Sequence, residues 1–137
     1  MTNQELLIQF GNHVGIRNLK LDQQGSCQLK INDSRNIIIN EVSETTLLIC
    51  GIIGTLTDGQ ATAAALELLS MNLLLARVNG PYLCWQPQQK TLLICLRVDS
   101  GEMDAIALGE NLSYLLQDVE QICHALKDKQ IFVEEIV

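Results

Sequence analysis

The segment from Asp58 to Val78 constrains the fold of this chain most strongly, because Ala, Leu and other helix-forming residues occupy nearly every position in it. Thr57 and Gln60 have the spacing of a capping box at its start, and Asn79-Gly80-Pro81 stops it. The sequence therefore predicts one long helix in the middle of the chain.

This central helix is apolar on two sides. A single sheet covers only one side, so the second is either covered by a terminal helix or loop, or forms the seam of a homodimer. The polar stripe between the two sides is broken, which favours the dimer. Asn72 flanks the second side, either as a polar residue that sets register or as a solvated rim residue. The first side carries Ala64, Leu68, Met71 and Leu75, and the second carries Leu66, Leu69, Leu73 and Ala76.

Shorter elements precede the central helix. Thr2 and Glu5 form a capping box for a short amphipathic helix that ends at Gly15. Apolar pairs at period two then predict three short antiparallel strands, and a longer apolar run predicts a strand covered on both sides. These four strands are marked by Leu19 and Leu21, Leu29 and Ile31, Ile37 and Ile39, and the run from Thr45 to Ile53.

Two strands and a helix follow the central helix. Tyr82 to Trp85 and Thr91 to Val98 predict a hairpin, and a last helix begins at about Met103 or Asp104. The element order is α-β-β-β-β-α-β-β-α. It predicts a single α+β domain over residues 1–137, with a twisted antiparallel sheet and three helices.

The composition limits the partners of the chain. The formal charge of −7 with scattered basic residues argues against binding to nucleic acid. Apolar residues make up 47% of the chain and charged residues 18%, which is rich in apolar groups for a small domain. Part of this apolar surface is therefore expected at an interface between chains, and a homodimer is the first candidate.

Cysteine usage and the N-terminus indicate the compartment. The five cysteines are odd in number and none forms a C-x-x-C pair, so we interpret them as buried thiols of a reducing compartment. The N-terminus carries no basic region of a signal peptide, and the longest apolar runs are too short to span a membrane. We expect a protein that is neither exported by a signal peptide nor inserted in a membrane.

The residues offer no catalytic constellation. His13 and His124 lie on predicted helices, where a histidine is usually solvated, and Cys123 beside His124 points in a different direction on the helix. Gly51 and Gly54 match a strand end and not a nucleotide-binding loop. We expect no enzyme activity, no metal site and no cofactor.

The chain resembles the small acidic class I chaperones of type III secretion, the Tir chaperone-like family. The resemblance rests on the element order, the small size and the acidity, together with three segments. These segments are Leu47-Leu48-Ile49-Cys50-Gly51-Ile52-Ile53-Gly54, the central helix, and Leu92-Leu93-Ile94-Cys95-Leu96-Arg97-Val98.

The resemblance implies a virulence-associated homodimer of the bacterial cytoplasm that acts without ATP hydrolysis. Such a chaperone binds the N-terminal chaperone-binding segment of a secreted effector in extended form and keeps it secretion-competent. The secretion ATPase is a further partner in this scheme. The dimer seam would use Leu66, Leu69, Asn72, Leu73 and Ala76. Effector binding would use Leu6, Leu7, Phe10, Leu19, Leu21, Leu29, Ile31, Ile37 and Ile39.

An alternative function is a dimeric α+β regulatory or adaptor module that shares this fold but binds a folded partner protein. Ordinary core packing is the alternative role for most of the apolar residues assigned to effector binding.

Overall fold

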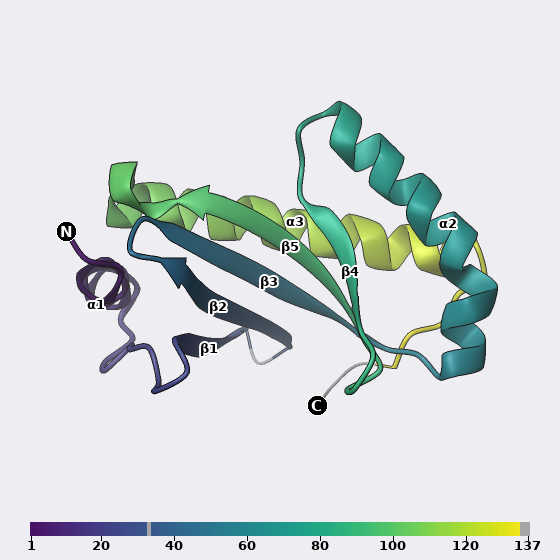
Figure 1. Ribbon diagram of the computed structural model, residues 1–137, viewed down its shortest axis with the longest axis horizontal. Helices are drawn as coiled ribbons and strands as arrows, with labels where there is room; N and C mark the ends of the chain where they lie inside the picture. Colours follow the sequence, from purple (N-terminus) through teal and green to yellow (C-terminus); the bar gives the residue numbers. More distant parts are fainter. Residues whose placement is uncertain (33, 135–137) are drawn as a thin grey trace. The chain divides into compact units, whose positions relative to one another are not determined.

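The computed structural model describes residues 1–32 and 34–134, and within them the chain is an α+β protein with three α-helices and five strands (Figure 1). The predicted fold class is confirmed. The elements are α1 (Asn3–Val14), β1 (Ser26–Ile31), β2 (Arg35–Ser43), β3 (Thr46–Thr55), α2 (Asp58–Arg77), β4 (Tyr82–Gln86), β5 (Thr91–Asp99), the 3₁₀ turn η1 (Ser100–Glu102) and α3 (Ala105–Asp128).

The strands form one sheet in the order β1-β2-β3-β5-β4. The hairpin between β1 and β2 places Cys27 opposite Ile39, and the hairpin between β4 and β5 places Tyr82 opposite Cys95. Because β3 neighbours β5 and not β4, helix α2 is the connection that carries the chain from an inner strand to an edge strand. The two edges of the sheet are β1 and β4.

The predicted strand at Leu19 and Leu21 is wrong, so three strands and not four precede α2. The Gln4 side chain explains the difference, since its amide bonds both polar groups that a neighbouring strand would otherwise pair. Gln4 Nε2 donates to the Leu19 carbonyl at 3.2 Å, and the Leu21 N–H donates to Gln4 Oε1 at 2.9 Å. Period-two spacing is also compatible with such a non-strand segment held against a helix.

The chain divides into two compact units, which we describe separately. The first contains Met1–Ile49 and Arg97–Tyr114, and the second contains Cys50–Leu96 and the chain from Leu115 onward. The division passes through β3, β5 and α3. The expectation of a single domain therefore stays a prediction.

In the first unit, Asn3 fixes the start of α1. This side chain is 2% exposed, donates to Glu41 Oε2 at 2.8 Å and to the Ser43 carbonyl at 2.9 Å, and accepts a hydrogen bond from the Ser100 hydroxyl. A buried polar group with three partners carries no desolvation penalty for unmade bonds. Aliphatic side chains fill the rest of the core, including Leu6, Leu7, Phe10, Ile37, Ile39, Leu47, Ile49, Leu108 and Leu112.

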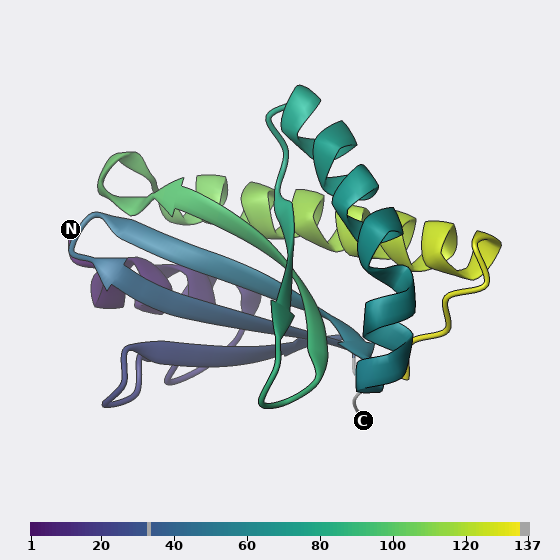
Figure 2. The ribbon, with the colours of Figure 1, turned by 45° about the vertical axis from the view of Figure 1, so that its right-hand side comes forward.

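In the second unit, α2 leads through a tight turn into β4, and the two elements contact each other (Figure 2). Lys129, just after α3, forms an ion pair with Glu67 of α2 at 3.3 Å. The end of the described chain pairs with the end of β3, because the Thr55 N–H donates to the Glu134 carbonyl at 2.8 Å and the Glu134 N–H donates back at 3.0 Å.

Candidate functional site

One side of α2 is exposed and aliphatic. We call it the α2 outer face and define it by residues whose side chains are more than half exposed; Leu66, at 80%, is the most exposed of them. Contiguous apolar surface of this kind is rare on monomers and usually marks a protein-binding site. The α2 outer face consists of Leu66, Leu69, Leu73, Leu74 and Val78.

The opposite side of α2 packs against its own unit. Ala64 and Met71 are buried, and Leu68 and Leu75 are half-buried. The predicted division of the helix into two apolar sides is therefore confirmed, whereas the use of the outer side in a dimer stays a prediction. The sequence analysis missed Leu74 and Val78, which their spacing of four residues at the end of the helix could have indicated.

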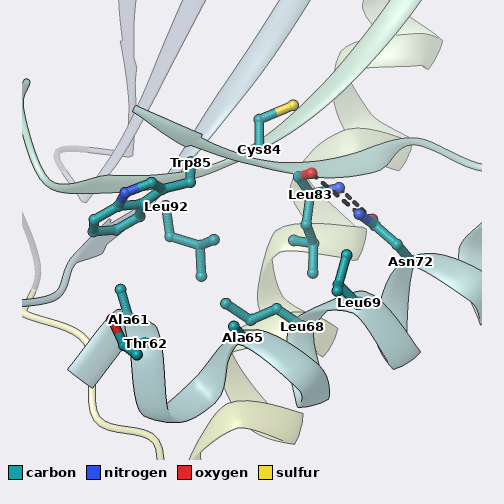
Figure 3. A pocket seen from close by; sticks show the side chains of 10 residues that line it. All are labelled: Ala61, Thr62, Ala65, Leu68, Leu69, Asn72, Leu83, Cys84, Trp85 and Leu92. Carbon is teal, nitrogen blue, oxygen red and sulfur yellow. Dashed lines mark hydrogen bonds between the residues drawn. The ribbon is translucent and has the colours of Figure 1, made fainter. Parts of the chain in front are cut away.

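A hollow of about 370 Å³ lies between α2 and the β4–β5 hairpin (Figure 3). Leu83 and Leu92 point from the sheet toward Ala65 and Leu68 of the helix, and the Trp85 ring lies at the end of the hollow nearest Ala61. The lining is almost entirely apolar. Leu69 belongs to this lining as well as to the α2 outer face, so the hollow opens beside that face.

Asn72 joins α2 to the edge strand β4 (Figure 3). The Leu83 N–H donates to Asn72 Oδ1 at 2.6 Å, and Asn72 Nδ2 donates to the Leu83 carbonyl at 3.3 Å. The side-chain amide thus occupies both backbone groups of one residue on the edge strand. Asn72 is half-buried, and its predicted place in the dimer seam stays a prediction. Its contact with β4 was missed, because sequence spacing does not show which strand residue a helix amide meets.

The first unit holds a second hollow, the α1 groove, with a volume of about 430 Å³. Arg17 and Lys20 are exposed at this groove, so two cations stand at its rim in a chain whose formal charge is −7. Close packing of α1 on the following loop shapes the groove: a Cβ added at Gly11 would lie 2.6 Å from the Ile16 carbonyl oxygen. The groove is lined by Gln4, Ile8, Asn12, Ile16, Arg17, Asn18, Leu19, Lys20 and Leu21.

Most of the side chains predicted to bind an effector lie in the core of the first unit. Leu21 and Ile31 are half-buried and can be reached from outside, and Leu21 also lines the α1 groove. The remaining residues are at most 6% exposed, so in this structure they support the surface from below and a direct contact by them stays a prediction. They are Leu6, Leu7, Phe10, Leu19, Leu29, Ile37 and Ile39. The sequence analysis did not assign Ile8 and Ile16, which continue the apolar lining of the groove.

The described residues contain no group of three or more His, Cys, Asp or Glu side chains that could hold a metal ion. In the part of the chain that the structure describes, the cysteines form no disulfide; Cys84 and Cys123 are half-buried and the other three are buried. Burial raises the pKa of the Cys27 thiol, which keeps it protonated and unreactive. No helix in the described part of the chain has the length and apolarity to cross a bilayer.

The fold and these surfaces define the class of small α+β proteins that act by binding other proteins. More specifically, the chain belongs to the Tir chaperone protein (CesT) family, whose sequence profile matches residues 5–122. The Tir chaperone of Escherichia coli O157:H7 is 25% identical over 129 residues, which cover 94% of this chain and 82% of the relative.

Two solved structures share the fold. The HopA1-SchA chaperone-effector complex contains a chain with a TM-score of 0.74 at 17% identity, over 88% of this chain and 91% of that chain. The ExsC-ExsE complex contains a chain with a TM-score of 0.74 at 18% identity, over 88% of this chain and 90% of that chain. Family membership makes this chain a chaperone of the Tir chaperone type, and not an enzyme.

Proposed function

We propose that the chain is a cytoplasmic homodimer that binds the N-terminal chaperone-binding segment of a secreted effector, keeps it extended, and requires no ATP hydrolysis. The observation that carries this proposal is the division of the exposed apolar surface. The α2 outer face lies on the second unit, while the α1 groove lies on the first. One surface is assigned to a second copy of the chain and the other to the effector.

The α2 outer face suits a second copy because it is a helical stripe of flexible aliphatic side chains. Burying one such side chain fully is worth about 1.5–3 kcal/mol, and the five of them together can offset the entropy cost of association. A two-fold axis across α2 would pair the stripe with itself. Asn72 and Ala76 belong to the same proposal as neighbours of the stripe.

We expect Leu73→Asp to convert the dimer into a folded monomer, because a carboxylate in the seam would be desolvated without a partner. Leu73 is 55% exposed, so the substitution leaves the core intact. Sedimentation equilibrium measures the change. Ile106→Asp is the matched control, since Ile106 is 59% exposed on α3 and should leave the dimer unaffected. A Leu73→Asp protein that remains dimeric would remove the seam assignment.

The α1 groove and the edge strand β1 suit an extended segment. An added strand at β1 would gain main-chain hydrogen bonds, and apolar anchors of the segment would fill the groove. Arg17 and Lys20 favour a segment with an acidic residue beside its anchors. Ordering the segment costs free energy on binding, which keeps the complex reversible without ATP.

We expect Ile8→Asp to abolish protection of the effector segment from protease while the dimer persists. Ile8 is 46% exposed and lines the groove, so its replacement places a charge where an apolar anchor would sit. Limited proteolysis of an effector N-terminal segment, with and without the chaperone, measures protection. Val42→Asp is the control, because Val42 is 48% exposed in the same unit and does not line the groove. Equal protection by both variants would place effector binding elsewhere.

The secretion ATPase completes the proposal as the partner that receives the loaded chaperone. The resemblance to class I chaperones of type III secretion is the only support for this step. A pull-down of the ATPase by the loaded dimer, with the empty dimer as control, tests it.

A further inference from the structure

β4 is an edge strand, so alternate residues direct their backbone N–H and C=O groups toward its free edge. Leu83 lies opposite Ile94 of β5. Its N–H nevertheless donates to Asn72 Oδ1 at 2.6 Å, and its carbonyl accepts from Asn72 Nδ2 at 3.3 Å (Figure 3). Leu83 therefore faces the free edge and not β5, and Trp85, two residues further along the strand, faces the same way.

Asn72 makes the two hydrogen bonds that a further strand would make to Leu83. A side-chain amide has one acceptor and one donor side, as a peptide group has, so it occupies both backbone groups of that residue. The edge position before the strand is Pro81, which has no N–H to donate. A second strand aligned on β4 would therefore find at most one residue, Trp85, with both groups open.

The surroundings of Asn72 also indicate that its amide serves the edge. Asn72 lines the hollow between α2 and the β4–β5 hairpin, together with Leu68, Leu69 and other apolar residues. A half-buried amide in such a lining costs free energy unless its polar groups are bonded, and both of them are bonded to β4. An aliphatic side chain would suit the hollow but would leave the edge open.

The other edge of the sheet, β1, is capped at its start. The Asp22 N–H donates to the Ser26 carbonyl at 2.7 Å, and the Ser26 N–H donates to Asp22 Oδ1 at 2.9 Å. Ser26 thus faces the free edge of β1, and by alternation Gln28 and Lys30 face it too. Both have exposed side chains and an N–H, so β1 presents two successive residues to an added strand.

We propose that Asn72 closes the β4 edge against strand addition and thereby confines an added strand to β1. The occupant that Asn72 excludes from β4 is a second copy of the same strand. Two β4 strands would fit each other antiparallel around a two-fold axis, with Leu83 of one copy paired to Trp85 of the other. Use of β1 by an effector segment rests on the proposed function, whereas closure of β4 needs no effector.

The test adds substitutions at Asn72 to the Leu73→Asp protein, in which the α2 outer face carries a charge. Asn72→Ala should open the edge, so sedimentation velocity should detect, as the concentration rises, a species with about twice the mass of the Leu73→Asp protein. Asn72→Asp is the matched control, because it also loses the donor to the Leu83 carbonyl but keeps an acceptor and puts a charge at the edge. It should not associate.

No association of Asn72→Ala, or equal association of the alanine and aspartate variants, would overturn the proposal. Equal association would mean that general destabilisation, and not an open edge, brings the chains together. Circular dichroism checks that both variants fold. Because no effector is present, this outcome is independent of whether the chain binds an effector segment.

Amide hydrogen exchange identifies the strand that pairs. In dilute Asn72→Ala, the Leu83 amide should exchange at least about tenfold faster than in Asn72→Asp, because the alanine provides no acceptor. At concentrations where the protein associates, the Leu83 and Trp85 amides should both become protected. Association that leaves these two amides unprotected would place the contact elsewhere and contradict the proposal.

The Leu73→Asp protein with Asn72 retained gives a test that does not depend on how Asn72→Ala folds. Its Leu83 and Trp85 amides should exchange at rates that do not change with protein concentration, because the β4 edge stays closed. Protection of the Trp85 amide that rises with concentration would show that a second chain pairs with β4 in spite of Asn72, and would overturn the proposal.

Discussion

At the scale of single residues, local patterns in the sequence predict backbone features well and side-chain partners poorly. Both capping boxes, at Thr2 and at Thr57, have the predicted reciprocal hydrogen bonds, because a cap depends on residues only three positions apart. The pairing of Asn72 with Leu83 and the contact of Gln4 with Leu19 and Leu21 could not be predicted, since each depends on how elements meet in space.

Gly54 is a residue whose identity the structure requires. Its φ is +155°, and a Cβ at this position would lie 2.6 Å from the Glu134 carbonyl oxygen and 3.1 Å from the Val133 Cβ. Gly54→Ala should therefore displace residues 133–134 from β3 and lower the free energy of unfolding by about 1–3 kcal/mol. Urea unfolding at a fixed protein concentration measures the effect.

Gly59→Ala is the control for this prediction. A Cβ at Gly59 meets nothing within 4 Å, and the residue lies in the first turn of α2, so the free energy of unfolding should stay equal or rise by less than about 1 kcal/mol. Equal effects of the two substitutions would mean that the contact of Gly54 with residues 133–134 contributes nothing to the free energy of unfolding.

At the scale of elements, the periodicity of the sequence predicts the helices and the β4–β5 hairpin, but not every strand. The α2 prediction succeeds because its two apolar sides arise from repeats of three and four residues over a long segment. The Leu19 and Leu21 pair fails because two alternating residues are too short a signal, and a side-chain amide can hold such a segment as well as a strand does.

The junction of α2 with β4 depends on Asn72. Asn72→Ala should lower the free energy of unfolding by about 1–3 kcal/mol, because it leaves two backbone groups of Leu83, a residue that is 8% exposed, without their partner. Ser70→Ala is the control: the Ser70 hydroxyl donates to the Leu66 carbonyl of its own helix, and its removal should change the free energy of unfolding by less than about 0.5 kcal/mol.

Hydrogen exchange distinguishes this account from general destabilisation. The Leu83 amide should exchange faster in Asn72→Ala than in Ser70→Ala, relative to the other amides of β4. An unchanged Leu83 amide in a destabilised protein would show that Asn72 acts through another contact.

At the scale of the whole molecule, the element order predicted the fold class, and a resemblance carried by three sequence segments, the element order, the size and the acidity indicated the family. The binding surfaces needed the structure. The aliphatic residues assigned to effector binding have the same period-two pattern whether they face a groove or a core, and most of them face the core. For α2 it was easier to predict which apolar residues are exposed and which are buried. A single sheet covers only one side of a helix, so a helix with two apolar sides leaves one of them uncovered.

The central claim is that this chain acts by holding an effector segment. Native mass spectrometry of the chain co-expressed with the N-terminal segment of a secreted effector encoded beside it tests that claim most directly. We predict a complex of two chains and one segment, which is lost with Ile8→Asp and retained with Val42→Asp. Recovery of the chain without any segment, for every effector of its secretion system, would contradict the claim.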